Sequence, residues 1–127
     1  MSLRLPHAAL ALLAGAVACR DAMEPNGPTG PFAVAATDSA LRLTNLGDRA
    51  VNTFVVDANA LPYINWAPCA DPVRCPGIAP GGGQIVPFSD ASLGLRRGGR
   101  AAVSWWHIVR TSDGYRPDSI RVFVIDL

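Results

Sequence analysis

The 127-residue chain has no long apolar run, no lysine and no block of like charges. Its main apolar run covers residues 8–18, whereas a membrane-spanning helix needs about 20 residues. The sequence therefore excludes a transmembrane helix there. All eleven basic residues are arginines, and they are spread along the chain without a basic stripe. This distribution argues against binding to nucleic acid.

Residues 1–18 have the organisation of an export signal. Arg4 places a positive charge ahead of residues 8–18, whose length suits the apolar region of about 7–15 residues in a signal peptide. Ala16 and Ala18 are small enough for a signal peptidase. The alternative, a buried amphipathic helix, is disfavoured because alanine, leucine and glycine cover every side of the run. We therefore predict that residues 1–18 are a signal peptide.

The end of this segment, Ala16-Val17-Ala18-Cys19, resembles the lipobox of bacterial lipoproteins, with Ala16 where the family prefers leucine. The resemblance implies cleavage before Cys19, acylation of that cysteine and anchorage to a lipid bilayer of the bacterial cell envelope. Within that family, Arg20 in place of an aspartate points to the outer membrane. Residues 19–31 are then the lipidated cysteine and a flexible tether rich in proline and glycine.

The chain has three cysteines, an odd number that leaves one thiol to explain in an exported protein. If Cys19 carries lipid, Cys69 and Cys75 remain as a pair, in the stretch PCADPVRCP. Outside the cytoplasm such a pair is expected to form a disulfide. A metal site of Cys69, Cys75 and His107 is disfavoured, because the spacing is not that of zinc ligands and no fourth ligand is evident. We expect no metal and no cofactor.

Residues 32–127 are predicted to form one all-β domain, an antiparallel sandwich of about 6–8 short strands, with a small open barrel as the alternative. The expected strands cover 32–36, 40–45, 51–57, 84–88, 100–111 and 119–127, with short ones near 63–66 and 93–95. The segments LRLTNLGDRAVNTFVV and PGGGQIVPF resemble immunoglobulin-like accessory domains of bacterial surface proteins. That resemblance implies a sandwich of this kind and no catalytic residues.

No pattern supports a catalytic centre. His107 is the one histidine after residue 18, but it lies in an expected strand and no GxSxG motif accompanies it. Four aspartates lie in turns, where they are expected to accept hydrogen bonds from the nearby backbone; these are Asp71, Asp90, Asp113 and Asp118. Their positions match neither a carboxylate pair nor a calcium loop.

Two adjacent tryptophans are the most suggestive side chains, because neighbours on a strand point to opposite faces of a sheet. Trp105 shares its face with two valines and is expected in the core, which places Trp106 on the outer face. The long 59–83 loop, which carries Tyr63 and Trp66, either covers that outer ring or leaves it exposed. We predict that Trp106, Trp66 and Tyr63 form a recognition surface for a protein or carbohydrate ligand.

These expectations together describe a membrane-anchored, exported lipoprotein with a non-enzymatic binding or envelope-structural β domain. The alternative is a small extracytoplasmic hydrolase or a protease inhibitor that uses the 59–83 region. A hydrolase would need a polar cluster at a pocket, whereas an inhibitor would present an exposed, rigid loop such as residues 68–76.

Overall fold

The computed structural model describes residues 29–127 and shows an all-β chain. In chain order the strands are β1 (Phe32–Ala36), β2 (Ala40–Asn45), β3 (Asn52–Asp57), β4 (Gly83–Pro87), β5 (Arg100–Trp106), β6 (Ile108–Thr111), β7 (Gly114–Pro117) and β8 (Arg121–Asp126). A single-turn 3-10 helix, η1 (Leu61–Tyr63), interrupts the long connection between β3 and β4. The predicted strands at 32–36 and 40–45 are confirmed to the residue.

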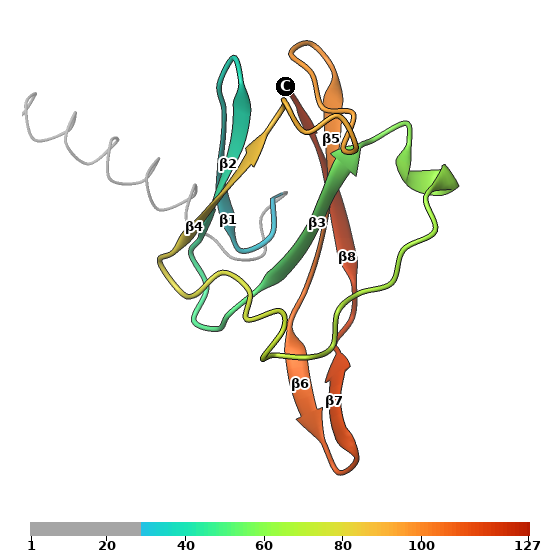
Figure 1. Cartoon of the computed structure of the whole chain (residues 1–127). Helices are drawn as coiled ribbons and strands as arrows, with labels where there is room; N and C mark the ends of the chain where they lie inside the picture. Colours follow the sequence, from blue (N-terminus) through green and yellow to red (C-terminus); the bar gives the residue numbers. More distant parts are fainter. Residues whose placement is uncertain (1–28) are drawn as a thin grey trace, which may run out of the picture.

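The strands form two three-stranded sheets and a separate hairpin, and every strand pair is antiparallel. One sheet has the order β1-β2-β4, the other the order β3-β5-β8, and β6 pairs with β7. In Figure 1 the two larger sheets lie against each other, and the β6–β7 hairpin extends beyond one end. The antiparallel all-β prediction is thus confirmed.

A shared apolar core lies between the two sheets. Alternate residues of each strand point inward, so β1 and β2 contribute Phe32, Leu41 and Leu43, while β5 contributes Val103 and Trp105. Phe32 meets the Trp105 ring edge to face, with the centroids 6.2 Å apart. The antiparallel register therefore brings aromatic side chains from both sheets into one core.

Two short predicted strands do not form. In the segment near 63–66, Tyr63 ends η1 and residues 64–66 continue as irregular chain. Residues 91–94 form turns, and the Asp90 carboxylate accepts hydrogen bonds from the backbone and hydroxyl of Ser92. Leu95 is nevertheless buried and joins the core. The alternating leucines at 93–95 therefore indicate burial of an irregular segment and not a strand.

The predicted strand 100–111 is broken at His107. Before the break, β5 pairs with β3 and β8, and after it β6 pairs with β7. The His107 carbonyl accepts a hydrogen bond from the Asp118 N–H at 2.7 Å, which closes the base of the hairpin. The chain thus leaves one sheet and enters another at a position that sequence pattern alone treats as continuous strand.

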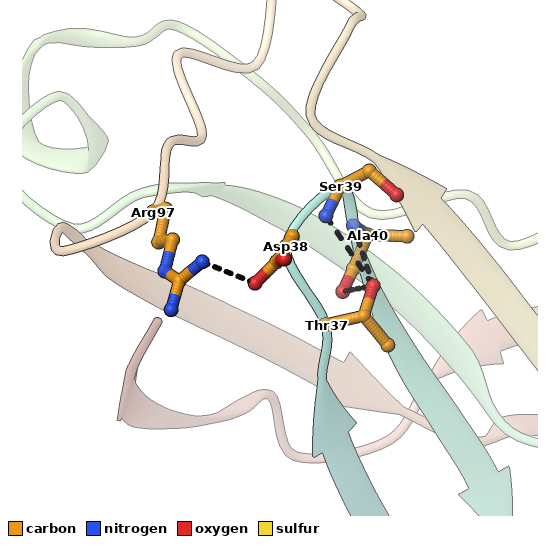
Figure 2. A network of polar contacts seen from close by, with 5 residues as sticks. All are labelled: Thr37, Asp38, Ser39, Ala40 and Arg97. Carbon is orange, nitrogen blue, oxygen red and sulfur yellow. Dashed lines mark hydrogen bonds and ion pairs between the residues drawn. The ribbon is translucent and has the colours of Figure 1, made fainter.

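The β1–β2 turn lies at the end of the sandwich opposite the 46–50 turn. Figure 2 shows the Thr37 hydroxyl accepting hydrogen bonds from the N–H groups of Ser39 and Ala40 and donating to the Ala40 carbonyl. Asp38 at the tip forms an ion pair with Arg97. Both charged side chains are well exposed, so this ion pair contributes little to stability.

Candidate functional site

The long connection between β3 and β4 crosses the outer face of the β3-β5-β8 sheet as irregular chain. Cys69 and Cys75 are joined by a disulfide within it, as predicted. Between them the Asp71 carboxylate accepts hydrogen bonds from the N–H groups of Val73 and Arg74, and the Cys75 N–H donates to the Asp71 carbonyl. The Asp71 carboxylate thus stabilises the turn in which it lies, as the sequence predicts for aspartates in such positions.

Trp66 of this connection packs against two aromatic rings of the sheet. Phe54 of β3 stacks on Trp66 with the centroids 4.5 Å apart, and Trp66 lies 5.7 Å from Trp106. The Trp106 indole N–H donates to the Cys69 carbonyl at 2.9 Å, at the edge of the disulfide loop. A buried indole needs such a partner, so the disulfide loop is tied directly to the outer face of β5.

The structure brings two of the three predicted recognition residues together. Trp106 lies on the outer face as predicted, but it is 3% exposed because Trp66 and the disulfide loop cover it. Tyr63 on η1 is 89% exposed and lies outside the aromatic stack. The three side chains therefore do not form one open surface, and a binding role for them stays a prediction. Cys19 lies outside the described residues.

A different group of side chains converges at the end of the sandwich where the described chain begins. A pocket of about 180 Å³ is lined by Pro31, Gly47, Asp48, Arg49, Trp105, His107 and Arg121. We call it the arginine pocket. It draws on the entry to β1, the turn between β2 and β3, the β5–β6 break and the start of β8. These segments are distant in the sequence.

Buried Asn45 holds the turn that carries Arg49. Its side-chain NH₂ donates to the carbonyls of Arg49 at 2.7 Å and Ile78 at 2.8 Å, while its side-chain oxygen accepts from the Gly47 N–H at 2.9 Å. Asn45 is fully buried, so these bonds are expected to persist. The backbone beneath Arg49 is therefore fixed by the Asn45 side chain.

Trp105 forms the apolar wall of the arginine pocket. The Arg121 guanidinium lies 5.4 Å from the centroid of the Trp105 ring, a cation–π arrangement. His107 meets the same indole edge to face at 5.8 Å. Glycine is required at position 30, because a Cβ there would come within 2.8 Å of the Trp105 ring and φ is positive. The entering chain thus packs against the wall of the pocket.

The surroundings of His107 favour its uncharged form. Burial lowers its pKa from the ordinary value of 6.5, and the positive charges of Arg49 and Arg121 lower it further against the opposing effect of Asp118 and Asp48. The Arg49 Nη2 lies 3.4 Å from the His107 Nδ1. In the neutral ring Nδ1 can accept from Arg49, which leaves Nε2 as the donor.

A second, polar cleft of about 400 Å³ lies along β3 and β4, and Asn52, Thr53 and Gln84 contribute to it. The Thr53 hydroxyl donates to the Gln84 side-chain oxygen at 2.5 Å. Two polar groups of the cleft are therefore already bonded to each other. The cleft has no charged lining residue. It is therefore a weaker candidate than the arginine pocket.

Comparison with protein-family models, with curated proteins and with solved structures finds no match to this chain. Within residues 29–127, no helix is long and apolar enough to cross a membrane. The same residues contain no group of three or more histidine, cysteine or acidic side chains placed to hold a metal ion.

Sequence reasoning missed Arg49 and Arg121 as site residues. Both occupy exposed positions beside turns, where an arginine is ordinary. Only the register that places Trp105 opposite both Thr53 and Arg121 brings the second arginine to the pocket. The Asn–x–Gly sequence at 45–47 is the one local signal, since such a pattern indicates a side chain that braces a turn.

Proposed function

We propose that the chain is an exported bacterial lipoprotein, anchored through lipid on Cys19, whose domain binds a ligand without catalysing a reaction. The observation that carries this proposal is which of the three cysteines form a disulfide. Cys69 and Cys75 are joined to each other, which leaves Cys19 as the third cysteine of the sequence. A cysteine directly after a signal-like apolar run is the acceptor for lipid in this class of protein.

The strand order supports an immunoglobulin-like domain as part of the proposal. Constant-type immunoglobulin sandwiches carry strands A, B, E and D in one sheet and C, F and G in the other. The orders β1-β2-β4 and β3-β5-β8 correspond to A-B-E and C-F-G. The connection between β3 and β4 stands where strand D would be, and it covers an outer sheet face instead of extending an edge.

The surroundings of His107 support binding over catalysis. In a serine-hydrolase triad a carboxylate orients the imidazole and stabilises its positive charge. Here Nδ1 faces the Arg49 guanidinium at 3.4 Å, and the pKa of His107 is lowered by burial and by that cation. A ring held in this way is a poor general base, whereas its uncharged N–H remains a good donor to a ligand.

One observation favours the alternative, a protease inhibitor. Val73 is 88% exposed on the disulfide loop, as a residue presented to a protease would be. However, the Cys75 N–H donates to the Asp71 carbonyl, so the backbone there is a closed turn and not an extended strand. Peptide segments that pair with a partner's sheet edge need extended backbone. We therefore rank the inhibitor second.

Anchorage is tested by expressing the full chain in a bacterium with lipoprotein processing and feeding it labelled palmitate. We expect label on the wild type and none on Cys19→Ala, with the variant misprocessed or lost from the membrane fraction. The matched control is Cys69→Ser with Cys75→Ser, which should still take up label. Intact mass showing an unmodified Cys19 in the mature wild type would overturn the proposal.

A further inference from the structure

The lining of the arginine pocket carries one more positive than negative charge, while Asp118 lies near His107 outside the lining. Two arginines and one aspartate line it, and His107 is uncharged at neutral pH because burial and Arg49 lower its pKa. Within residues 29–127 the ion pair is Arg97 with Asp38, at the opposite end of the sandwich. Arg49 and Arg121 therefore keep guanidinium donors available for an anion from outside.

The size of the pocket limits the anion. Sites for drug-sized ligands occupy about 300–1,000 Å³, and this one is near 180 Å³. At about 30 Å³ of liquid volume for each water molecule, it holds a small polyatomic ion with a few waters. A large ligand would enter with one charged group only.

The positions of the donors indicate the shape of the anion. Arg49 comes from the β2–β3 turn and Arg121 from the start of β8, so the guanidinium groups line the same pocket from different elements. His107 also lines the pocket, so its ring N–H can serve as a third donor. A tetrahedral phosphate has enough oxygens to accept from two guanidinium groups and an imidazole together, whereas a carboxylate has two oxygens.

We propose that the arginine pocket binds a single phosphate group, held by Arg49, Arg121 and the His107 N–H against the Trp105 wall. The two arginines are held in place before binding, since Asn45 fixes the turn under Arg49 and Arg121 packs on the Trp105 ring. Pre-organised donors lose less conformational entropy on binding than free side chains do.

The phosphate has two possible sources, a soluble phosphate compound or a lipid headgroup. Pro31 lines the pocket, and Thr29 lies ten residue steps along the chain from Cys19. At about 3.3 Å for each extended residue, the domain entry is within roughly 33 Å of the anchor. The lipid source rests on the proposed acylation of Cys19, whereas binding of phosphate itself does not.

The first test titrates the native full-length protein, in a non-ionic detergent, with inorganic phosphate while the tryptophan indole signals are followed by NMR. We expect a saturable shift of the Trp105 indole and little change at Trp66 and Trp106, which lie on the outer face and serve as internal controls. Sodium chloride at equal ionic strength should not reproduce the shift. Equal shifts with chloride, or equally tight saturation with acetate, would overturn the proposal.

Variants then locate the site. Arg49→Gln and Arg121→Gln should each weaken phosphate binding by about tenfold or more, the scale of one charge-assisted hydrogen-bonding pair. Arg42→Gln is the matched control, because Arg42 is an exposed strand arginine outside the pocket. If Arg121→Gln fails to fold for lack of its contact with Trp105, Arg49→Gln decides. An equal loss in Arg42→Gln and Arg49→Gln would refute a defined site.

The second test distinguishes the sources by adding phosphatidylglycerol or phosphatidylcholine to the detergent micelles. A Trp105 shift with phosphatidylglycerol that Arg49→Gln abolishes supports a lipid phosphate as the ligand. A shift with inorganic phosphate alone supports a soluble phosphate compound. Failure of acylation at Cys19 would remove the lipid source and leave the phosphate titration unaffected, so the two proposals fail separately.

Discussion

Trp105 and Trp106 are neighbours in β5, and both are buried, but different parts of the molecule bury them. Trp105 faces the opposite sheet, from which Phe32 meets it edge to face, and Arg121 of the neighbouring strand β8 lies over its ring. Trp106 faces outward and is buried by irregular chain, through Trp66 and the Cys69 carbonyl. Side chains of β1 and β8 therefore cover Trp105, whereas Trp66 and the disulfide loop cover Trp106.

The difference shows how a small sandwich protects an apolar outer face. A sheet of three strands has two faces, and the β1-β2-β4 sheet can cover only one of them. The connection between β3 and β4 covers part of the other, whereas β8 keeps Val122 and Val124 at 51% exposed each. The covering is therefore local and depends on few contacts.

The largest expected effect is at the inner ring. Trp105→Ala should lower the free energy of unfolding by about 3–5 kcal/mol, because it removes a core ring that contacts both sheets. Chemical denaturation followed by circular dichroism measures this loss. A loss smaller than that of Trp106→Ala would contradict the assignment of Trp105 to the main core.

At the outer ring, Trp106→Ala should cost about 3 kcal/mol, the low end for a buried tryptophan, since an irregular loop can relax into the space. Trp106→Phe is the control, because it keeps an aromatic ring and loses mainly the hydrogen bond to the Cys69 carbonyl, worth about 1 kcal/mol. The same denaturation assay compares them. A negligible loss in Trp106→Ala would mean that the loop does not hold the ring in solution, and would revive the predicted recognition surface.

The disulfide should matter to one tryptophan and not to the other. Replacing Cys69 and Cys75 together by serine should lower the free energy of unfolding by roughly 2–3 kcal/mol, the closure entropy of so short a loop. NMR spectra of the variant should show a displaced indole signal for Trp106 and an unchanged one for Trp105. Equal displacement of both signals would show that the disulfide loop supports the whole sandwich.

The smallest effect is the pH dependence from His107. Burial and Arg49 lower its pKa below 6.5, so between that folded value and 6.5 the unfolded chain binds more protons than the folded one. This contribution to stability is complete above about pH 6.5 and is lost as the pH falls toward the folded pKa. His107→Gln should remove this part of the slope in urea midpoints measured from pH 7.5 to 5. Identical slopes in both proteins would argue against a lowered pKa.

Local pattern predicted β1, β2, β3, β4 and β8, each of which lies within one sheet, but it missed β7. Alternation over 40–45 and the turn residues on either side were sufficient for β2, and the prolines around Cys69 and Cys75 indicated the disulfide loop. Pattern failed where the chain changes partners. Nothing local marks His107 as the end of β5, because the break arises from the different partners of β5 and β6.

The sequence by itself determined the all-β class, the pairing of two cysteines and the opposite orientation of the two tryptophans, since each follows from composition or from the period of two along a strand. The tertiary structure alone decided that the outer ring is covered and that Arg49, His107 and Arg121 share a pocket. These side chains come from different elements, and only the pairing of β3 and β8 with β5 sets the distances between them. Period and turn chemistry act over a few residues, whereas a site built across two sheets depends on register and sheet packing.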